Sequence, residues 1–326
     1  MSSLLIGLLG ALVATNQPPA VSNLAAATLG VSQQIAATTQ EPVEKELDRL
    51  MEKDNAAQAE VDQWIRENEK FAAAGAGAPA NELNRRIRTR FEPVRSGYED
   101  LIRRYPTNAD ARVAYASFLN DMGDEDGQAA QLEKALLLDP ADPAIWNNLA
   151  NFYGHTGELA KAFEYYEKAI VLNPAEPVYY QNLAATASLF RKDAREYYHI
   201  DEQQVFDKSL DLYAKALKLD PGNFPLATEL AQTYYLIRPT RTEDALRAWT
   251  NALGAAHDDI EREGVYIHLA RLKLNSGRFA EARAHLDAVT NRMYTDLKDR
   301  LARNLAEKQK KGEETNLPSA QANPGR

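Results

Sequence analysis

Residues 143–176 read PAIWNNLANFYGHTGELAKAFEYYEKAIVLNPAE, and this stretch predicts the fold of the chain. Apolar residues recur in it at intervals of three and four on both sides of Gly157. Because residues three and four apart share one helical face, the stretch predicts two amphipathic helices. Glycine permits the turn between them, and Pro174 ends the second helix because proline cannot continue it.

The same spacing recurs along the chain. Pro106, Pro140 and Pro174 are each 34 residues apart, and Pro221 follows after 47. A fixed period of this length is typical of stacked copies of one small structural unit. A single helix pair cannot cover its own apolar stripe, so successive copies must pack on one another.

Residues 143–176 also carry a specific set of large and small residues at fixed positions: Trp146, Leu149, Ala150, Tyr153, Gly157, Ala162, Tyr166, Ala169 and Pro174. The chain therefore resembles proteins with tetratricopeptide repeats (TPRs). The resemblance implies an all-α fold, a right-handed TPR superhelix (α-solenoid) of about five helix pairs with helical caps. We expect Trp146 and the tyrosines to fill the space between units.

The 34-residue spacing predicts five units, at residues 109–142, 143–176, 177–223, 224–257 and 263–290. The third unit is longer because of an insertion at residues 191–203, RKDAREYYHIDEQ. Two interpretations of the insertion remain open. It forms a second recognition surface, or it lengthens a helix whose tyrosines pack on the neighbouring unit.

Helical segments precede the array. Residues 81–106 predict an N-terminal capping helix, and residues 74–80, with two glycines and a proline, predict a loop. Residues 41–73 predict a long amphipathic helix, or a pair of helices broken near Asp54 and Asn55.

Two further segments follow the array. Residues 291–311 are polar and charged, and they predict a C-terminal capping helix that shields the end of the stack. Residues 312–326 lack apolar periodicity, so we expect a disordered tail there.

The first 40 residues contain no Asp, Glu, Lys or Arg. The apolar run at residues 4–14 is shorter than the roughly 20 residues of a membrane span, but it suits the core of a secretory signal. Small residues at Ala25 and Ala27 offer a cleavage pattern, with residues 1–27 removed. We favour an exported, periplasmic protein over a cytoplasmic one whose leader docks on the first helices, and we predict no integral membrane span.

Composition excludes several classes of protein. A formal net charge of −9 and a pI near 5.3 argue against general binding to nucleic acid or anionic membrane. The chain has no cysteine, so it forms neither disulfides nor thiolate zinc sites.

The resemblance to TPR proteins implies a concave groove lined by the first helix of each unit. Carried over by position, the candidate partner-binding residues are Asn147, Asn148, Asn151, His155, Gln181, Asn182, Ser188, Glu229, Gln232, Tyr235, His268 and Arg271. An asparagine amide both donates and accepts hydrogen bonds, so it can hold a peptide backbone. Asn148 and Asn182 share one position, at which some TPR families build an asparagine ladder. The alternative is that they only cap or solvate their helices.

One binding mode of TPR proteins does not fit this sequence. TPR co-chaperones grip acidic peptide tails with lysine and arginine at defined positions of three successive units. This chain has Val113, Val178 and Asn182 at those basic positions, so a carboxylate clamp of that kind is not predicted.

Charged and potentially catalytic residues give no enzyme motif. The run Arg85, Arg86, Arg88 and Arg90 either binds an anionic partner or forms a solvated helix face. The histidines show no HExxH pair, and the glycines at residues 75–77 lack the context of a phosphate loop. We therefore predict no catalytic residue, no metal site and no cofactor.

The sequence predicts a noncatalytic scaffold or adaptor that binds a peptide or helix of a partner protein in the groove. Two alternatives remain open: an exported or envelope-associated assembly component, and an accessory regulatory subunit of an enzyme. The sequence does not identify the partner or the oligomeric state.

Overall fold

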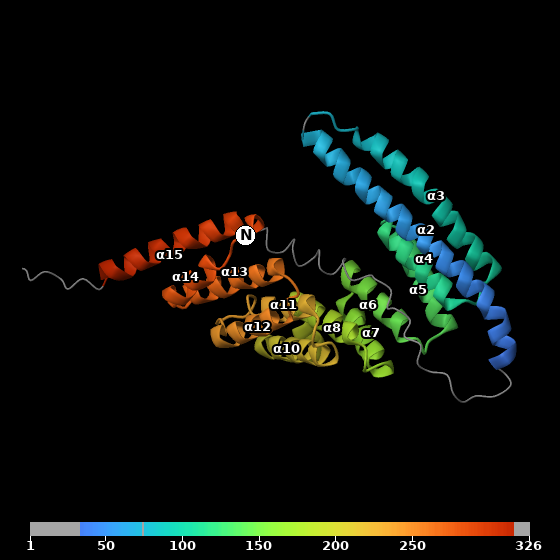
Figure 1. The fold of residues 1–326 in the computed structure, drawn as a ribbon. Helices are drawn as coiled ribbons and strands as arrows, with labels where there is room; N and C mark the ends of the chain where they lie inside the picture. The colour runs from blue at the N-terminus through green and yellow to red at the C-terminus, as the bar shows by residue number, and fades with distance from the viewer. Residues whose placement is uncertain (1–32, 74, 316–326) are drawn as a thin grey trace, which may run out of the picture. The chain divides into compact units, whose positions relative to one another are not determined.

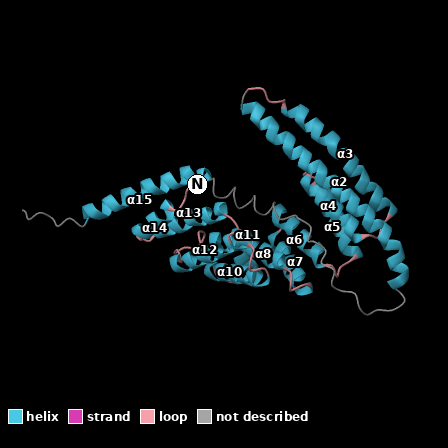
Figure 2. Cartoon of the chain, viewed as in Figure 1, coloured by secondary structure: helices cyan, strands magenta, loops and turns pink. Residues whose placement is uncertain are grey.

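The computed structural model describes residues 33–73 and 75–315. Within these residues the chain forms fourteen α-helices, α2 to α15, and one 3₁₀ helix, with no strand (Figure 2). The predicted all-α class is therefore confirmed. Most of the predicted leader at residues 1–40 lies outside the described residues. The chain divides into two compact units, residues 1–158 (unit 1) and 159–326 (unit 2).

The described part of unit 1 begins with a long helical hairpin. Helices α2 (Gln33–Ala73) and α3 (Ala80–Arg104) lie side by side and antiparallel (Figure 1). Helix α2 is continuous, so the alternative of two helices broken near Asp54 is wrong. It also begins at Gln33, inside the segment assigned to the leader.

Hydrogen bonds explain how a polar residue is accommodated on the buried side of α2. Asp54 is only 6% exposed, and its carboxylate accepts hydrogen bonds from Tyr98 Oη at 3.1 Å and from Gln58 Nε2 at 2.9 Å. Gln58 Nε2 lies 2.9 Å from Asp121 as well. A buried carboxylate with these donors stays inside the helix, which explains why Asp54 does not break it.

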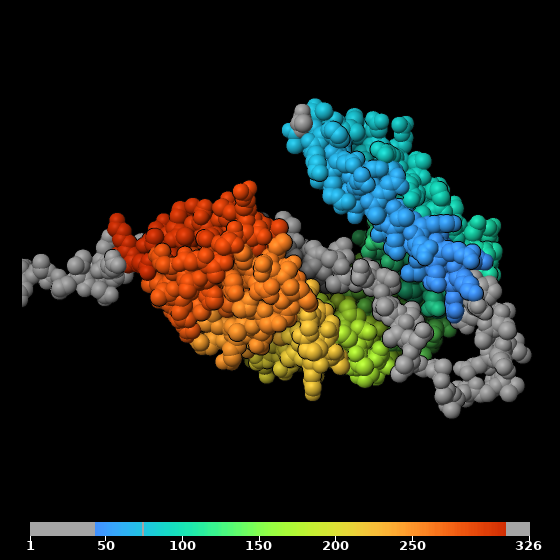
Figure 3. Space-filling model, viewed as in Figure 1, coloured from blue at the N-terminus to red at the C-terminus, as the bar shows by residue number. Residues whose placement is uncertain are grey.

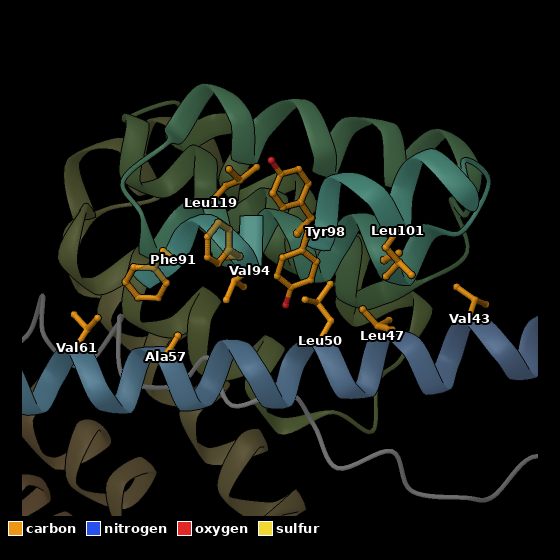
Figure 4. Close-up of a cluster of buried hydrophobic side chains, with 13 residues drawn as sticks. Val43, Leu47, Leu50, Ala57, Val61, Phe91, Val94, Tyr98, Leu101 and Leu119 are labelled. Atoms are coloured by element: carbon orange, nitrogen blue, oxygen red, sulfur yellow. The ribbon is translucent and has the colours of Figure 1, made fainter. Parts of the chain in front are cut away.

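Helices α4 (Ala109–Asp121), α5 (Glu125–Leu138) and α6 (Pro143–Thr156) complete the described part of unit 1. The apolar stripe of α2 points toward α3, and α4 closes the same core (Figure 4). The fully buried Tyr98 of α3 stacks on Tyr115 of α4, with ring centroids 5.5 Å apart. The core contains Val43, Leu47, Leu50, Ala57, Val61, Phe91, Val94, Tyr98, Leu101, Ala111, Tyr115, Phe118 and Leu119.

Unit 2 is a succession of helices in which neighbours along the chain pack together. They are α7 (Leu159–Leu172), α8 (Pro177–Leu189), α9 (Arg191–Tyr198), α10 (Glu202–Leu219), α11 (Phe224–Thr233), α12 (Thr242–Ala255), α13 (Asp259–Asn275), α14 (Phe279–Asp287), the 3₁₀ helix (Arg292–Tyr294) and α15 (Thr295–Thr315). The five predicted helix pairs correspond to α4 with α5, α6 with α7, α8 with α10, α11 with α12, and α13 with α14.

Turn and cap chemistry explains where the repeat helices begin and end. Gly157 ends α6 with φ of 87°, a left-handed conformation that glycine adopts without strain. Asp142 caps the start of α6 by accepting a hydrogen bond from the backbone N–H of Ala144 at 2.8 Å. Asn223 does the same for α11 through Leu226, at 2.9 Å.

The insertion at residues 191–203 forms a separate helix, α9, rather than lengthening α8. Phe190, with φ of −102° and ψ of 48°, interrupts the helical path between them. Tyr197 and Tyr198 pack around Phe163 of α7, with ring centroids 5.3 Å and 5.6 Å from that ring. The tyrosines of the insertion therefore contact the second helix of the preceding repeat.

Helix α15 covers the last repeat. Its Leu301 and Leu305 are buried in one cluster with Ile267 and Leu274 of α13. The helix continues to Thr315, so the prediction of a disordered tail from residue 312 is wrong for residues 312–315. The remainder of that tail lies outside the described residues.

Trp146 differs from expectation. It is only partly buried, and its indole Nε1 donates to the carbonyl oxygen of Pro140 at 2.9 Å. The preceding residue, Ile145, is fully buried together with Leu149. Consecutive residues are separated by about 100° around a helix. The buried stripe of α6 is therefore centred on Ile145 and Leu149, which places Trp146 at its edge.

Candidate partner-binding site

Three first helices of unit 2 carry most of the predicted site. Helix α8 holds Gln181 and Asn182, α11 holds Glu229 and Gln232, and α13 holds His268 and Arg271. Tyr235 is the second residue after the end of α11. The structure joins these residues into two hydrogen-bonded groups, one between α8 and α11 and one between α11 and α13.

The first group links Gln181 to Glu229. Gln181 Nε2 donates to Glu229 Oε1 at 3.0 Å. Burial raises the pKa of Glu229, while hydrogen bonds from Gln181 and from Tyr213 of α10 act in the opposite direction. The glutamine amide thus stabilises a carboxylate that is largely removed from solvent, and it links the two helices.

The second group is aromatic. Tyr235 Oη lies 3.0 Å from His268 Nδ1, and the His268 ring stacks on Trp249 of α12 with centroids 3.9 Å apart. Burial, with a smaller contribution from Arg271, lowers the pKa of His268 to about 3. Burial also raises the pKa of Tyr235 to about 12. Both side chains are therefore neutral across the physiological range.

Arg271 adds a cation at the edge of this group. Its guanidinium lies 5.9 Å from the centre of the Tyr235 ring, within the range of a cation–π contact. The side chain is partly exposed, so its donors can also reach solvent or a ligand.

Burial separates the remaining candidates in unit 2. Gln232 is partly exposed, whereas Asn182 is 6% exposed and Ser188 is 1% exposed. Ser188 Oγ donates to the carbonyl oxygen of Ala185 at 3.0 Å. Ser188 therefore belongs to the interior of its helix pair, and the expectation that it faces a groove is wrong. Little of the Asn182 amide is accessible to a partner.

The other candidates lie on α6, in unit 1. Asn147 is 7% exposed, Asn148 and Asn151 are partly exposed, and His155 is exposed. Asn148 and Asn182 belong to different units, so the proposed asparagine ladder stays a prediction. Among the four α6 residues, Asn147 has the least surface left for a partner.

The place of Trp249 in the second group could not be predicted from the sequence. Its spacing on α12 indicates a core residue, and it is indeed 1% exposed. Nothing in the sequence pairs it with a histidine of the next repeat. Such a stack depends on how α12 packs against α13, which the repeat pattern does not specify.

The same part of the chain offers neither a metal site nor a membrane span. Within residues 33–73 and 75–315, no three histidine or carboxylate side chains gather in a way that could hold a metal ion. No helix in these ranges combines the length and the hydropathy needed to cross a bilayer.

Comparison with known proteins identifies one of the helix pairs. Residues 143–175 match the family described as tetratricopeptide repeat. The chain therefore contains a TPR at these residues. The matched repeat consists of α6 and α7, so its first helix lies in unit 1 and its second in unit 2. No curated protein matches this TPR chain in sequence.

Solved structures are similar to this chain at low sequence identity. The crystal structure of PilW, a type IV pilus biogenesis factor, is 14% identical, covers 74% of this chain and 98% of its own, and has a TM-score of 0.51. The structure of pilF from Pseudomonas aeruginosa is 15% identical, with coverages of 78% and 99% and a TM-score of 0.49. A TPR protein of Thermus thermophilus is 21% identical, with coverages of 61% and 100% and a TM-score of 0.42.

Proposed function

We propose that this TPR protein is a noncatalytic scaffold or adaptor that holds an extended peptide segment of a partner along the first helices of unit 2. The observation that supports this is the series of partly exposed polar side chains on α8, α11 and α13, among them Gln181, Gln232 and Arg271. Hydrogen bonds already hold several side chains of these helices in place. Such preorganisation lowers the entropic cost of binding.

The chemistry suits a peptide backbone. The amide of Gln232 offers donors and an acceptor, Gln181 retains its carbonyl oxygen, and Arg271 supplies donors only. Each hydrogen bond adds about 1 kcal/mol net, whereas micromolar affinity corresponds to roughly 8 kcal/mol. Several contacts must therefore act together, and an extended segment that crosses successive repeats can make them.

The pKa values of the aromatic group favour binding over catalysis. A general acid or base works best with a pKa near the working pH. The pKa of His268 is held near 3 by burial, and that of Tyr235 is raised to about 12. Their hydrogen bond therefore suits a structural support for the binding surface better than a proton-transfer pair.

A site-specific crosslink tests the proposal. A photoreactive benzoylphenylalanine replaces Gln232 on α11, and the full-length protein is irradiated in cells that express it. The matched control places the same residue at Asn251, which is exposed on the second helix α12. We expect a defined protein adduct from position 232 and none of the same mass from position 251.

A second variant makes the test specific. Arg271→Ala should reduce the adduct formed at position 232, whereas Lys215→Ala, an exposed change on α10, should leave it unchanged. The proposal fails if positions 232 and 251 give the same adducts, or if neither alanine variant can be distinguished from the parent.

A further inference from the structure

The loop end of the α2–α3 hairpin concentrates positive charge. Between residues 80 and 90, α3 carries Arg85, Arg86, Arg88 and Arg90 with the single acid Glu82, in a chain whose net charge is −9. Figure 1 and Figure 3 show that this end of the hairpin extends past α4 within unit 1. Arg85, Arg86 and Arg88 are exposed there, and Arg90 is partly exposed.

An open hollow lies between the two helices at this end. It has a volume of about 440 Å³ and is lined by Trp64, Glu82, Arg85, Arg86, Thr89 and Arg90. Trp64 of α2 forms its apolar wall and is partly buried. The hollow is thus shaped by one aromatic ring and three guanidinium groups.

The arginines of the hollow differ in how their charge is compensated. Arg90 Nε donates to Glu60 Oε2 at 2.7 Å. Among the residues that the structure describes, Arg85 and Arg86 form no ion pair, although Glu82 shares the lining. Thr89 Oγ1 donates to the carbonyl oxygen of Arg85 at 3.0 Å, so its hydrogen is already used. Two guanidinium groups are therefore available to an anion.

Trp64 holds one of these cations in place. The guanidinium carbon of Arg86 lies 3.6 Å from the centre of the Trp64 ring. Stacking covers the flat face of a guanidinium and leaves its N–H edge free to bind a carboxylate with two parallel hydrogen bonds. Arg86 is therefore oriented for such a bond before a ligand arrives.

We propose that this hollow binds an acidic segment of a partner protein through Arg85 and Arg86. A long polyanion such as a nucleic acid extends beyond these arginines and is repelled there by the remaining negative charge of the chain, whereas a short acidic segment can stay close to them. This surface is separate from the first helices of unit 2 and does not depend on the function proposed for them.

The test uses the full-length protein and a fluorescein-labelled hexaglutamate peptide, with binding measured by fluorescence anisotropy at low and at physiological salt. Arg85→Ala with Arg86→Ala should weaken binding about tenfold or more, the equivalent of one bidentate pair. The matched control is Arg103→Ala with Arg300→Ala, which removes the same charge at two exposed sites outside the hollow. That control should change affinity by about twofold or less, consistent with weak surface charges.

A third variant separates orientation from charge. Trp64→Ala keeps both arginines, and it should still weaken binding because Arg86 loses its support. The proposal is overturned if the parent protein does not bind the peptide, or if the two double variants lose affinity equally. It is also overturned if a single-stranded oligonucleotide of equal charge binds more tightly through the same two arginines. Circular dichroism of each variant checks that it is folded.

Discussion

The imidazole ring of His268 lies flat on the indole ring of Trp249, with centroids 3.9 Å apart and an angle of 6° between the planes. Tyr235 Oη holds the ring edge through Nδ1 at 3.0 Å. Because burial keeps the pKa of His268 near 3, the stacked ring is neutral in the folded protein. The group joins the turn after α11, the second helix α12 and the next first helix α13.

This neutral ring makes stability depend on pH. In the unfolded chain a histidine takes up a proton near pH 6.5, but the folded chain does not protonate His268 until about pH 3. Stability should therefore fall with decreasing pH below 6.5, by at most about 1.4 kcal/mol per pH unit from this group. His268→Phe keeps a ring but removes the titration. The free energy of unfolding, measured with urea between pH 5 and pH 7, should change less steeply with pH in the variant than in the parent. An equal pH dependence would contradict this assignment.

The two tryptophans of the repeats should differ in their effect on stability. Trp249 is 1% exposed, so Trp249→Ala empties a buried site and should cost about 3 to 5 kcal/mol. Trp146 is partly exposed, and Trp146→Ala should cost less than half as much. Chemical denaturation followed by circular dichroism measures both. Equal losses would mean that the buried stripe of α6 includes Trp146 after all.

The pair Gln181 and Glu229 should show energetic coupling. Gln181→Ala removes the donor at 3.0 Å and leaves a buried carboxylate poorly solvated, at a cost of about 1 to 3 kcal/mol. In the background of Glu229→Gln the same change should cost less, because no charge remains to be stabilised. A double-mutant cycle gives the coupling free energy, and a value near zero would rule out the pair as a link between α8 and α11.

Gln58 should matter more at neutral than at acidic pH. Its amide Nε2 contacts both Asp54 and Asp121, whose pKa values are raised mainly by burial. A raised carboxyl pKa means that folding favours the protonated form of Asp54 and Asp121. Their contribution to the free energy of unfolding therefore declines as pH rises, and the ionised carboxylates then depend more on the Gln58 amide. Gln58→Leu should therefore destabilise unit 1 more at pH 7 than at pH 4. Gln63→Leu, which changes an exposed glutamine on the same helix, serves as the control.

Glu263 should give stability the opposite pH dependence. Its carboxylate accepts hydrogen bonds from the backbone N–H groups of Asn291 and Thr290 at 2.6 Å and 2.9 Å, and these lower its pKa from 4.5. A lowered carboxyl pKa gives stability that is present above pH 4.5 and is lost as pH falls below it. Glu263→Gln should flatten thermal stability between pH 3 and pH 5, and an unchanged profile would contradict this role.

The sequence predicts the helix pairs because their apolar spacing reflects the main force that folds them. Gly157 and Pro174 indicate the turns for similar local reasons, since each restricts or frees the backbone directly. By contrast, the prediction that Trp146 fills a buried site was wrong. Ile145 is apolar too, and it occupies the buried side of the helix instead. A pattern of large residues does not decide between two adjacent ones.

The residues of the candidate site could be predicted from their positions within the repeat, but their contacts with one another could not. Gln181, Glu229, Tyr235 and His268 were all selected as first-helix residues, and the structure brings them together in pairs. The pairing itself depends on the packing of one repeat on the next, which involves residues 33 or more positions apart in sequence. The burial of Asn182 has the same origin, since the neighbouring helices decide how much of its amide remains accessible.

Helix α15 determines where the array stops. Its Leu301 and Leu305 occupy the apolar side of α13 and α14 that a sixth repeat would otherwise cover. A shortened chain that ends before Thr295 would present that side to solvent, and another copy could then add to it end to end. The polar outer side of α15 offers no such apolar surface, so it prevents further repeats from stacking on this end of the array.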